Sequence, residues 1–304
     1  MSSYTIGLII QSCVSVITVC GVFILTGLAG MTSFGQAAYM AVGAYVTFIL
    51  AASLQIPLVI ACIIGVVAAG LVTLIIGIPT LKLRKVYFAL VSIGISQAMS
   101  ALIITMKDVT KGALGFSRIP KVKNLMWIAL AIMALVIWMV WNFKSSRFGR
   151  MCIALKNDEL AAKGFGIDVY HLKIKAYILA SVFAAVGGIL YGAQVRILEP
   201  YTFGWNLSSE MVIFLFFGGT NSLTGSVVSA FLLKYLPEML RQVTIFGIEL
   251  QEFRTVIYCI LIIIILNFRP QGLFGEYEFS FRGTVDSLKK LAAKRERCIT
   301  GEKK

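Results

Sequence analysis

Long apolar runs alternate with short polar or glycine-rich breaks along most of the chain. Each run approaches the roughly twenty apolar residues that an α-helix needs to cross a bilayer. In lipid a segment must satisfy its own backbone hydrogen bonds, so we expect these runs to be helices. The runs are about 4–26, 34–54, 57–81, 86–106, 125–142, 174–197 and 253–268. The pattern predicts an all-α polytopic membrane protein.

The region 208–240 departs from this pattern. Two apolar pieces, about 210–218 and 226–240, are separated by the sequence GGTNSLTG. The first piece is too short to cross a bilayer as a straight helix. Two interpretations are open at this point: the pieces form a broken or re-entrant helix pair, or they belong to one long kinked span.

Basic residues favour the broken pair. Cytoplasmic loops carry an excess of Lys and Arg. The segments 82–85, 143–173 and 282–304 are all cytoplasmic if the N-terminus is outside and 208–240 enters the membrane twice. This topology has about 8–9 membrane segments. It leaves the basic loop 107–124 outside, against the rule.

Composition agrees with a membrane protein. Hydrophobic residues make up 59% of the chain and charged residues 14%, whereas about 25% of a typical soluble domain is charged. The net charge of +14 would also suit nucleic-acid binding. Since the basic residues lie in short loops and the tail, we expect them to set topology and expect no nucleic-acid partner. We predict one transmembrane domain at 1–275 and a basic cytoplasmic tail at 276–304.

The residues needed for catalysis are not found together in this sequence. It has a single histidine, His171, and no GxxxxGK[ST] phosphate loop. Its six cysteines are scattered, mostly within apolar runs, which is typical of small hydrophobic residues and not of a metal site. We therefore expect a protein that is not an enzyme and binds no metal. An ion-driven carrier would bury acidic residues at mid-membrane, and the sequence shows no such pair.

Two glycine-rich turns precede apolar helices, at 30–35 and 219–225. Each contains a serine that can cap the following helix, and Ser33 and Gln36 have the spacing of a capping box. Transporters often place substrate sites at broken helices. Ser33, Gln36 and Asn221 are therefore candidate substrate-pathway residues, where free backbone groups can meet a zwitterion. The alternative is that they only cap their own helices.

The polar loop, residues 143–173, contains a second candidate site. A cap, an acidic first turn, two small residues and a terminating glycine predict a short helix at about 157–167, to which a partner can approach closely. These residues are Asn157, Asp158, Glu159, Ala161, Ala162 and Gly166. The basic flank 144–150 is expected to fix the side of the membrane. The alternative is an ordinary cytoplasmic loop.

Five stretches resemble, in order, the permease subunits of bacterial branched-chain amino acid ABC importers, in particular the LivM type. They are GLAGMTSFGQAAYMAVGAY (27–45), VYFALVSIGISQ (86–97), SRFGRMCIALKNDELAAKGFGIDV (146–169), FGGTNSLTGSVVSA (217–230) and FRPQGLFG (268–275). The stretch 159–166 looks like the family's coupling helix, which sits in a groove of an ATPase. In the outer loop, Lys111 and Leu114 depart from the family's usual pattern, which bears on partner fit or substrate.

The resemblance implies several partners. They are a homologous LivH-type second permease subunit, two cytoplasmic ATPase subunits and an extracytoplasmic binding protein that delivers leucine, isoleucine or valine. This chain itself would hold no cofactor, because the ATPase subunits bind the ATP. It would lie, surrounded by lipid, in the bacterial inner (plasma) membrane as a multi-pass protein.

Other functions are open at this stage. Relatives of the same permease class move urea, short amides, sugars or nucleosides, and the binding protein carries most of the specificity. From other classes, an ion-coupled secondary transporter or a non-transporting scaffold would also be rich in apolar helices.

Overall fold

The computed structural model describes residues 3–117 and 119–240, together with 244–245, 248–249, 260, 263, 267, 272–273 and 275. Most of the predicted span 253–268 and the predicted tail 276–304 lie outside the described residues. The long helices are α1 (Ser3–Val22), α2 (Gln36–Ser53), α3 (Leu58–Thr80), α4 (Lys85–Thr105), α6 (Leu125–Ser145), α9 (Val169–Val195), α10 (Trp205–Gly218) and α11 (Leu223–Leu240). The short elements are η1 (Phe23–Leu28), α5 (Lys107–Thr110), η2 (Gly112–Leu114), α7 (Arg147–Asn157), α8 (Glu159–Gly164), η3 (Pro200–Phe203), β1 (Thr244–Ile245) and β2 (Ile248–Glu249).

Within the described residues, six helical segments are long and apolar enough to cross a membrane. They are Tyr4–Leu28, Gln36–Ser53, Leu58–Thr80, Lys85–Thr105, Leu125–Ser145 and Val169–Val195. They coincide with the first six predicted runs to within a few residues. The prediction of a helical, multi-pass membrane protein is therefore confirmed, with β1 and β2 forming only a two-residue antiparallel ladder. The total of 8–9 segments stays a prediction.

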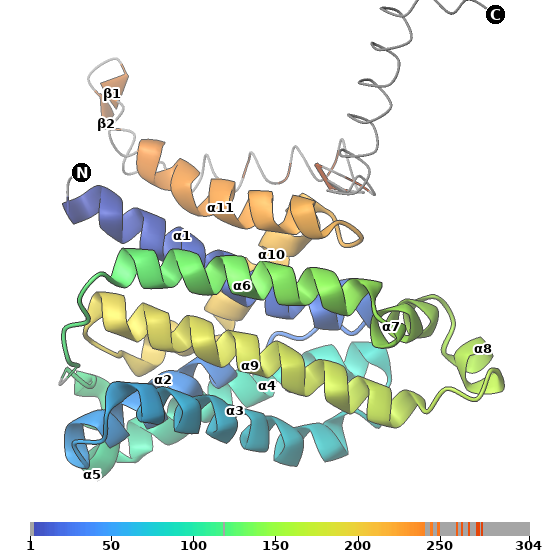
Figure 1. The fold of residues 1–304 in the computed structure, drawn as a ribbon, viewed down its shortest axis with the longest axis horizontal. Helices are drawn as coiled ribbons and strands as arrows, with labels where there is room; N and C mark the ends of the chain where they lie inside the picture. Colours follow the sequence, from blue (N-terminus) through green and yellow to red (C-terminus); the bar gives the residue numbers. More distant parts are fainter. Residues whose placement is uncertain are drawn as a thin grey trace, which may run out of the picture.

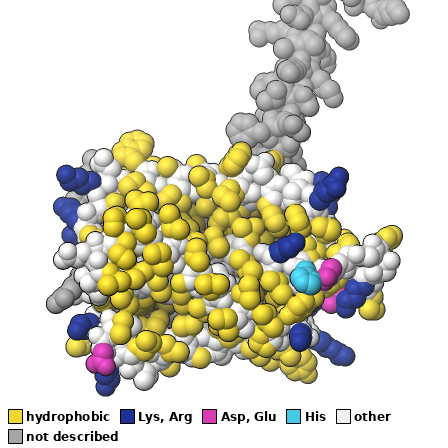
Figure 2. Space-filling model, turned by 60° about the horizontal axis from the view of Figure 1, so that its bottom comes forward, with side chains coloured by type: hydrophobic (Ala, Val, Ile, Leu, Met, Phe, Trp, Pro, Cys, Tyr) yellow, Lys and Arg dark blue, Asp and Glu magenta, His cyan; other side chains and the backbone are white. Residues whose placement is uncertain are grey.

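The helices run side by side as a bundle (Figure 1). Helix α9 is central and packs against α1, α2 and α3. Helices α3, α4 and α6 expose many large apolar side chains, as expected for surfaces that face lipid. Figure 2 shows a broad hydrophobic surface with Lys and Arg gathered towards its two ends, which suits a bilayer and its two polar boundaries.

Small residues bring α2 and α9 together. A Cβ added at Gly43 of α2 would lie 2.7 Å from the Cβ of Ala185 in α9. A Cβ at Gly188 of α9 would overlap the backbone of Met40. Membrane helices lack a hydrophobic driving force between them, so close van der Waals packing of this kind stabilises their association.

Helices α10 and α11 pack against each other along their lengths. The hydroxyl of Ser229 in α11 donates to the carbonyl oxygen of Phe214 in α10 at 2.6 Å. The turn between them carries the predicted cap, because Ser222 Oγ accepts the N–H of Gly225 at 3.0 Å. Residues 205–240 thus form two separate helices in contact, and the broken or re-entrant pair in the membrane stays a prediction.

Candidate functional site

The polar loop folds into two helices at one end of the bundle, α7 and α8 (Figure 1). The sequence predicts only one helix here, at about 157–167, and the second helix, α7, begins within the basic flank 144–150. Ser146 caps α7 by accepting the N–H of Gly149 at 3.2 Å. Gly149, Cys152 and Leu155 are the buried residues of α7. Their spacing of three residues is a helical signal that the sequence already contained.

Asp158, and not Asn157, caps α8. Its Oδ1 accepts the N–H of Leu160 at 2.8 Å and that of Ala161 at 3.1 Å. Asn157 is the last residue of α7, so its prediction as the cap was wrong. The reason is the extended backbone of Asp158 (φ −150°, ψ 114°), the conformation that an N-cap residue adopts.

Gly166 ends the α8 segment as predicted. Its φ of +76° is a left-handed conformation that favours glycine. The N–H of Gly166 donates to the carbonyl of Lys163 at 2.9 Å, and the N–H of Ile167 donates to that of Ala162 at 3.2 Å. This pair of bonds is a Schellman motif, which satisfies the last carbonyls of the helix and turns the chain back towards α9.

One ion pair joins α8 to α9, and a second lies within α8. Glu159 lies 2.9 Å from Lys173 of α9 and 3.3 Å from Lys163. Burial raises the pKa of Glu159, but the hydrogen bonds and charges of Lys173 and Lys163 outweigh burial and keep that pKa below its usual range. Beyond α8, hydrogen bonds from the backbone and ring of His171 lower the pKa of the exposed Asp168.

Two large apolar side chains, at Leu160 and Phe165, are exposed on α8 and at its C-terminal end, beside the exposed Lys163. Leu160 is 78% exposed and Phe165 is 87% exposed. Ala161 is exposed between them, whereas Ala162 is buried against its own chain. A partner at this surface would therefore meet Ala161 and not Ala162. Large apolar residues inside a charged stretch were the sequence signal for Leu160 and Phe165, which the predicted set does not include.

The first break, residues 29–35, separates η1 from α2. The capping box predicted for Ser33 and Gln36 is wrong, because Ser33 Oγ accepts the N–H of Gly35 at 3.2 Å. Both amide atoms of the buried Gln36 side chain lack a hydrogen-bond partner among the residues that the structure describes. Other helices satisfy the break instead. Ser92 of α4 accepts the N–H of Phe34 at 2.8 Å, and Ser208 of α10 accepts the N–H of Ala37 at 2.9 Å.

The second break, residues 219–222, lies beside the polar loop. Asn221 Oδ1 accepts a hydrogen bond from Lys156 Nζ of α7 at 2.6 Å. Its carbonyl oxygen accepts one from Lys144 Nζ of α6 at 2.8 Å. The structure thus places Ser33 and Gln36 at the first break and Asn221 at the second, where it is bonded to Lys156 and Lys144.

A charged pair joins α10 to α11. Glu210 Oε1 lies 2.8 Å from Lys234 Nζ, and both side chains are partly buried. No local sequence pattern indicates this pair, because Lys234 lies 24 residues after Glu210 in the chain. Gln11 and Tyr191 line the same small cavity of about 30 Å³. That volume has room for about one water molecule and is too small for an amino acid.

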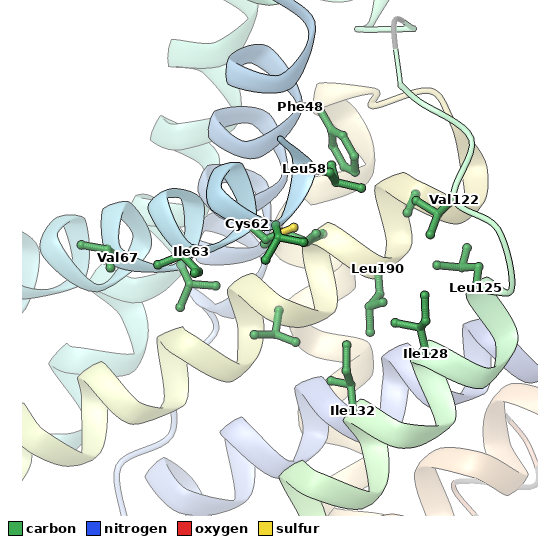
Figure 3. Close-up of a pocket in the computed structure, with 15 residues that line it drawn as sticks. Phe48, Leu58, Cys62, Ile63, Val67, Val122, Leu125, Ile128, Ile132 and Leu190 are labelled. Carbon is green, nitrogen blue, oxygen red and sulfur yellow. The ribbon is translucent and has the colours of Figure 1, made fainter. Parts of the chain in front are cut away.

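A larger hollow of about 490 Å³ lies between α3, α6 and α9. Figure 3 shows aliphatic and aromatic side chains around it, including Leu58, Leu125 and Leu190, with the sulfur of Cys62. It offers no charged or hydrogen-bonding side chain to orient a zwitterion. We therefore assign no substrate role to it.

Apolar helices, two helix breaks and a protruding helical loop together define a multi-pass membrane protein of the permease class. Residues 4–266 match the model of the family described as branched-chain amino acid transport system / permease component, and the chain belongs to this family.

Individual relatives agree with this assignment. The permease protein LivM of Escherichia coli (strain K12) is 23% identical over 286 residues, which cover 83% of this chain and 66% of LivM. The chain thus spans just under two thirds of that relative. LivH of Salmonella typhimurium is 24% identical over 287 residues, covering 85% of this chain and 90% of LivH. The solved structure of PsaBC from Streptococcus pneumoniae in complex with Fab aligns with a TM-score of 0.49 at 18% identity, covering 88% of this chain and 92% of that one.

Proposed function

We propose that this chain is a permease subunit of an ATP-binding cassette importer that translocates leucine, isoleucine and valine. The observation that carries the proposal is the family match over residues 4–266. The chain would pair with a second, LivH-type permease subunit, and two ATPase subunits would bind and hydrolyse ATP. A binding protein would deliver the amino acid from outside the bacterial inner membrane.

The polar loop supports the role of the ATPase subunits. We assign its end of the bundle to the cytoplasm, because Lys and Arg are concentrated there. Leu160 and Ala161 of α8 and Phe165, the C-cap residue that follows it, form a small exposed apolar surface. An apolar helix face of this kind fits into a groove of a partner. The cap at Asp158, the Schellman motif at Gly166 and the ion pair of Glu159 with Lys173 fix its orientation.

Leucine uptake tests the proposal. The chain is purified with the second permease subunit and the ATPase subunits, reconstituted into vesicles, and supplied with the binding protein and labelled leucine. Uptake that needs ATP on the ATPase side and is suppressed by unlabelled isoleucine and valine is the expected result. If the vesicles take up urea, a short amide, a sugar or a nucleoside but not leucine, the chain is still an importer subunit, and the proposed substrate is wrong.

An ion-coupled carrier is the second candidate, since Glu210 and Lys234 place charges among apolar helices. Lys234 neutralises Glu210 in a direct pair, which leaves the carboxylate less suited to binding a driving cation. The same vesicles separate the two functions. Uptake driven by a sodium or proton gradient without ATP would contradict the importer, and uptake that follows ATP alone would contradict the carrier.

A further inference from the structure

One lysine of the polar loop contacts both helix breaks. Lys156 lies near the end of α7, and its Nζ donates to the carbonyl oxygen of Gly27 at 2.8 Å and to Oδ1 of Asn221 at 2.6 Å. Gly27 belongs to η1, directly before the first break, and Asn221 lies in the second break. A single ammonium group therefore connects two segments that are nearly two hundred residues apart in the sequence.

The aliphatic part of the Lys156 side chain is also in close contact with the first break. Gly30 of the first break has a φ of +68°, and a Cβ added there would lie 2.9 Å from Cγ of Lys156. Any side chain at position 30 would therefore displace either the break or the lysine. The first break thus packs against the stem of Lys156 at Gly30, and the ammonium bonds Gly27 of η1, just before the break.

Neighbouring lysines reinforce the same junction. Lys144 donates to the carbonyl oxygen of Asn221 at 2.8 Å and lies over the Phe23 ring at 5.6 Å. Lys85 donates to the carbonyl oxygen of Lys156 at 3.3 Å. Burial lowers the pKa of Lys156, and the charges of Lys144 and Lys85 lower it further. The acceptors of the Lys156 ammonium are uncharged oxygens, and a hydrogen bond that involves one charged group contributes about 1.5–3 kcal/mol.

We expect helices α7 and α8 to move together, because the chain between them is short. Asp158 is the only residue between the two helices, and its N–H still donates to the carbonyl of Ala154 in α7 at 3.1 Å. A force applied to the exposed face of α8 is therefore passed to α7. Helix breaks absorb changes in φ and ψ more readily than intact helices do, so they are where such a force can produce a displacement.

We propose that Lys156 is the positioning residue that transmits movement of the polar loop to both helix breaks at once. The inference rests on the proposed function, in which an ATPase acts on α8, and it goes beyond it by naming the residue through which that action reaches the membrane segments. Lys156 touches neither ATP nor the transported molecule in this role.

Three variants test the transmission. Lys156→Met keeps the stem and removes the donors, Lys156→Arg keeps the positive charge and the donors, and Lys82→Met is the control, because Lys82 is an exposed lysine on the same end of the bundle. Each complex is reconstituted, and the amount of leucine moved per ATP hydrolysed is measured. We expect Lys156→Met to reduce this ratio about tenfold, the effect of losing a hydrogen bond to a charged group. Lys156→Arg is expected to keep most of the ratio and Lys82→Met all of it.

A purely structural role for Lys156 predicts a different result. Lys156→Met would then lower the yield and melting temperature of the complex, while the surviving complexes would keep the wild-type ratio, and that result would overturn the inference. The double variant Lys156→Met with Asn221→Ala adds an internal check. If the two residues act through one bond, the double variant is no worse than Lys156→Met alone.

Distance measurements complete the test. Spin labels at Thr220, within the second break, and at Val195, the last residue of α9, report whether the break moves when ATP binds. The shift is expected in the wild type and Lys156→Arg and absent in Lys156→Met. A full shift in Lys156→Met would overturn the inference while leaving the proposed function intact. Failure of the wild-type complex to couple leucine uptake to ATP would instead overturn the proposed function.

Discussion

The carboxylate of Glu159 lies 2.9 Å from the ammonium of Lys173, and this ion pair joins the helix of the polar loop to a helix long enough to cross the membrane. The Lys173 side chain is only 9% exposed and that of Glu159 is 32% exposed. An ion pair at this depth is screened less than one on an open surface. This ion pair therefore attaches the polar loop to α9.

Acid is expected to weaken this connection. The pKa of Glu159 is lower in the folded protein than its usual value, so the ion pair stabilises the fold above the unfolded-state pKa of about 4.3. The contribution is lost as the pH falls through the lower, folded-state pKa. With partial solvent screening, the contribution is about 0.5–1 kcal/mol. Hydrogen exchange of the α8 amides checks this in the wild type and in Glu159→Gln. The variant should exchange faster at neutral pH and lose the extra acid sensitivity, and equal protection in both proteins would contradict the prediction.

Two glycines of the polar loop should respond oppositely to alanine. A Cβ at Gly164 or at Gly166 meets nothing within 4 Å, so the two positions differ mainly in backbone conformation. Gly166 is left-handed, and Gly166→Ala should destabilise the end of α8 by about 1 kcal/mol. Gly164 lies within the helix, where alanine is favoured over glycine by up to about 1 kcal/mol. Hydrogen exchange of the Ile167 amide measures the stability of this helix end in both variants. Similar effects of the two substitutions would contradict the importance of the left-handed conformation at Gly166.

Charges placed on the exposed face of α8 should prevent ATPase binding. Leu160→Glu and Phe165→Glu replace side chains that are 78% and 87% exposed, so the fold should tolerate them. Burying either carboxylate in an apolar groove without a partner costs several kcal/mol. Co-purification with the ATPase subunits should fall sharply, with an unchanged melting temperature of the isolated chain. Leu114→Glu, at a 91% exposed position in the predicted outer loop, is the matched control. If Leu160→Glu and Phe165→Glu both still bind the ATPase subunits, the docking surface lies elsewhere on the chain.

Removal of one hydroxyl from α10 should destabilise the first break. Ser208 is fully buried and accepts the N–H of Ala37 at 2.9 Å. Ser208→Ala leaves that N–H without its acceptor, at a cost of about 1–3 kcal/mol. The adjacent Ser209 donates to the carbonyl of Trp205 within its own helix, so Ser209→Ala should change the unfolding free energy by less than about 0.5 kcal/mol. Denaturant titration in mixed micelles compares the two, and an equally small effect at both serines would contradict the role of Ser208.

Local features of the chain were predictable because their causes are local. The apolar run of each of the first six spans is contiguous, so length and hydrophobicity alone locate the helix. Gly166 and Ser222 act within a few residues of their own positions, and the structure confirms them as a helix end and a helix cap. Cap placement at Asn157 failed by one residue, because Asn and Asp cap equally well and only the backbone conformation distinguishes them.

Contacts between helices could not be predicted from the sequence, because they join residues that are far apart in the chain. The sequence predicts that Ser33 and Gln36 satisfy the first break, and the structure assigns that task to Ser92 and Ser208. Ser208 acts on a backbone N–H 171 residues away. In a soluble protein, hydrophobic periodicity shows which face of a helix is buried. In lipid most faces of a helix are apolar, so the periodicity does not show which other helix packs against a given face.

The sequence by itself determined that this protein is a helical, multi-pass membrane protein, and its motifs indicated the family to which it belongs. It also located the polar loop and the two breaks, since apolar run length, turn glycines and charge are properties of contiguous residues. Only the tertiary structure decided that α7 precedes α8, that Glu159 is paired with Lys173, and that Lys156 reaches both breaks. Those relationships depend on the packing of helices distant in the chain, which brings single polar side chains within 3 Å of partners that no local pattern names.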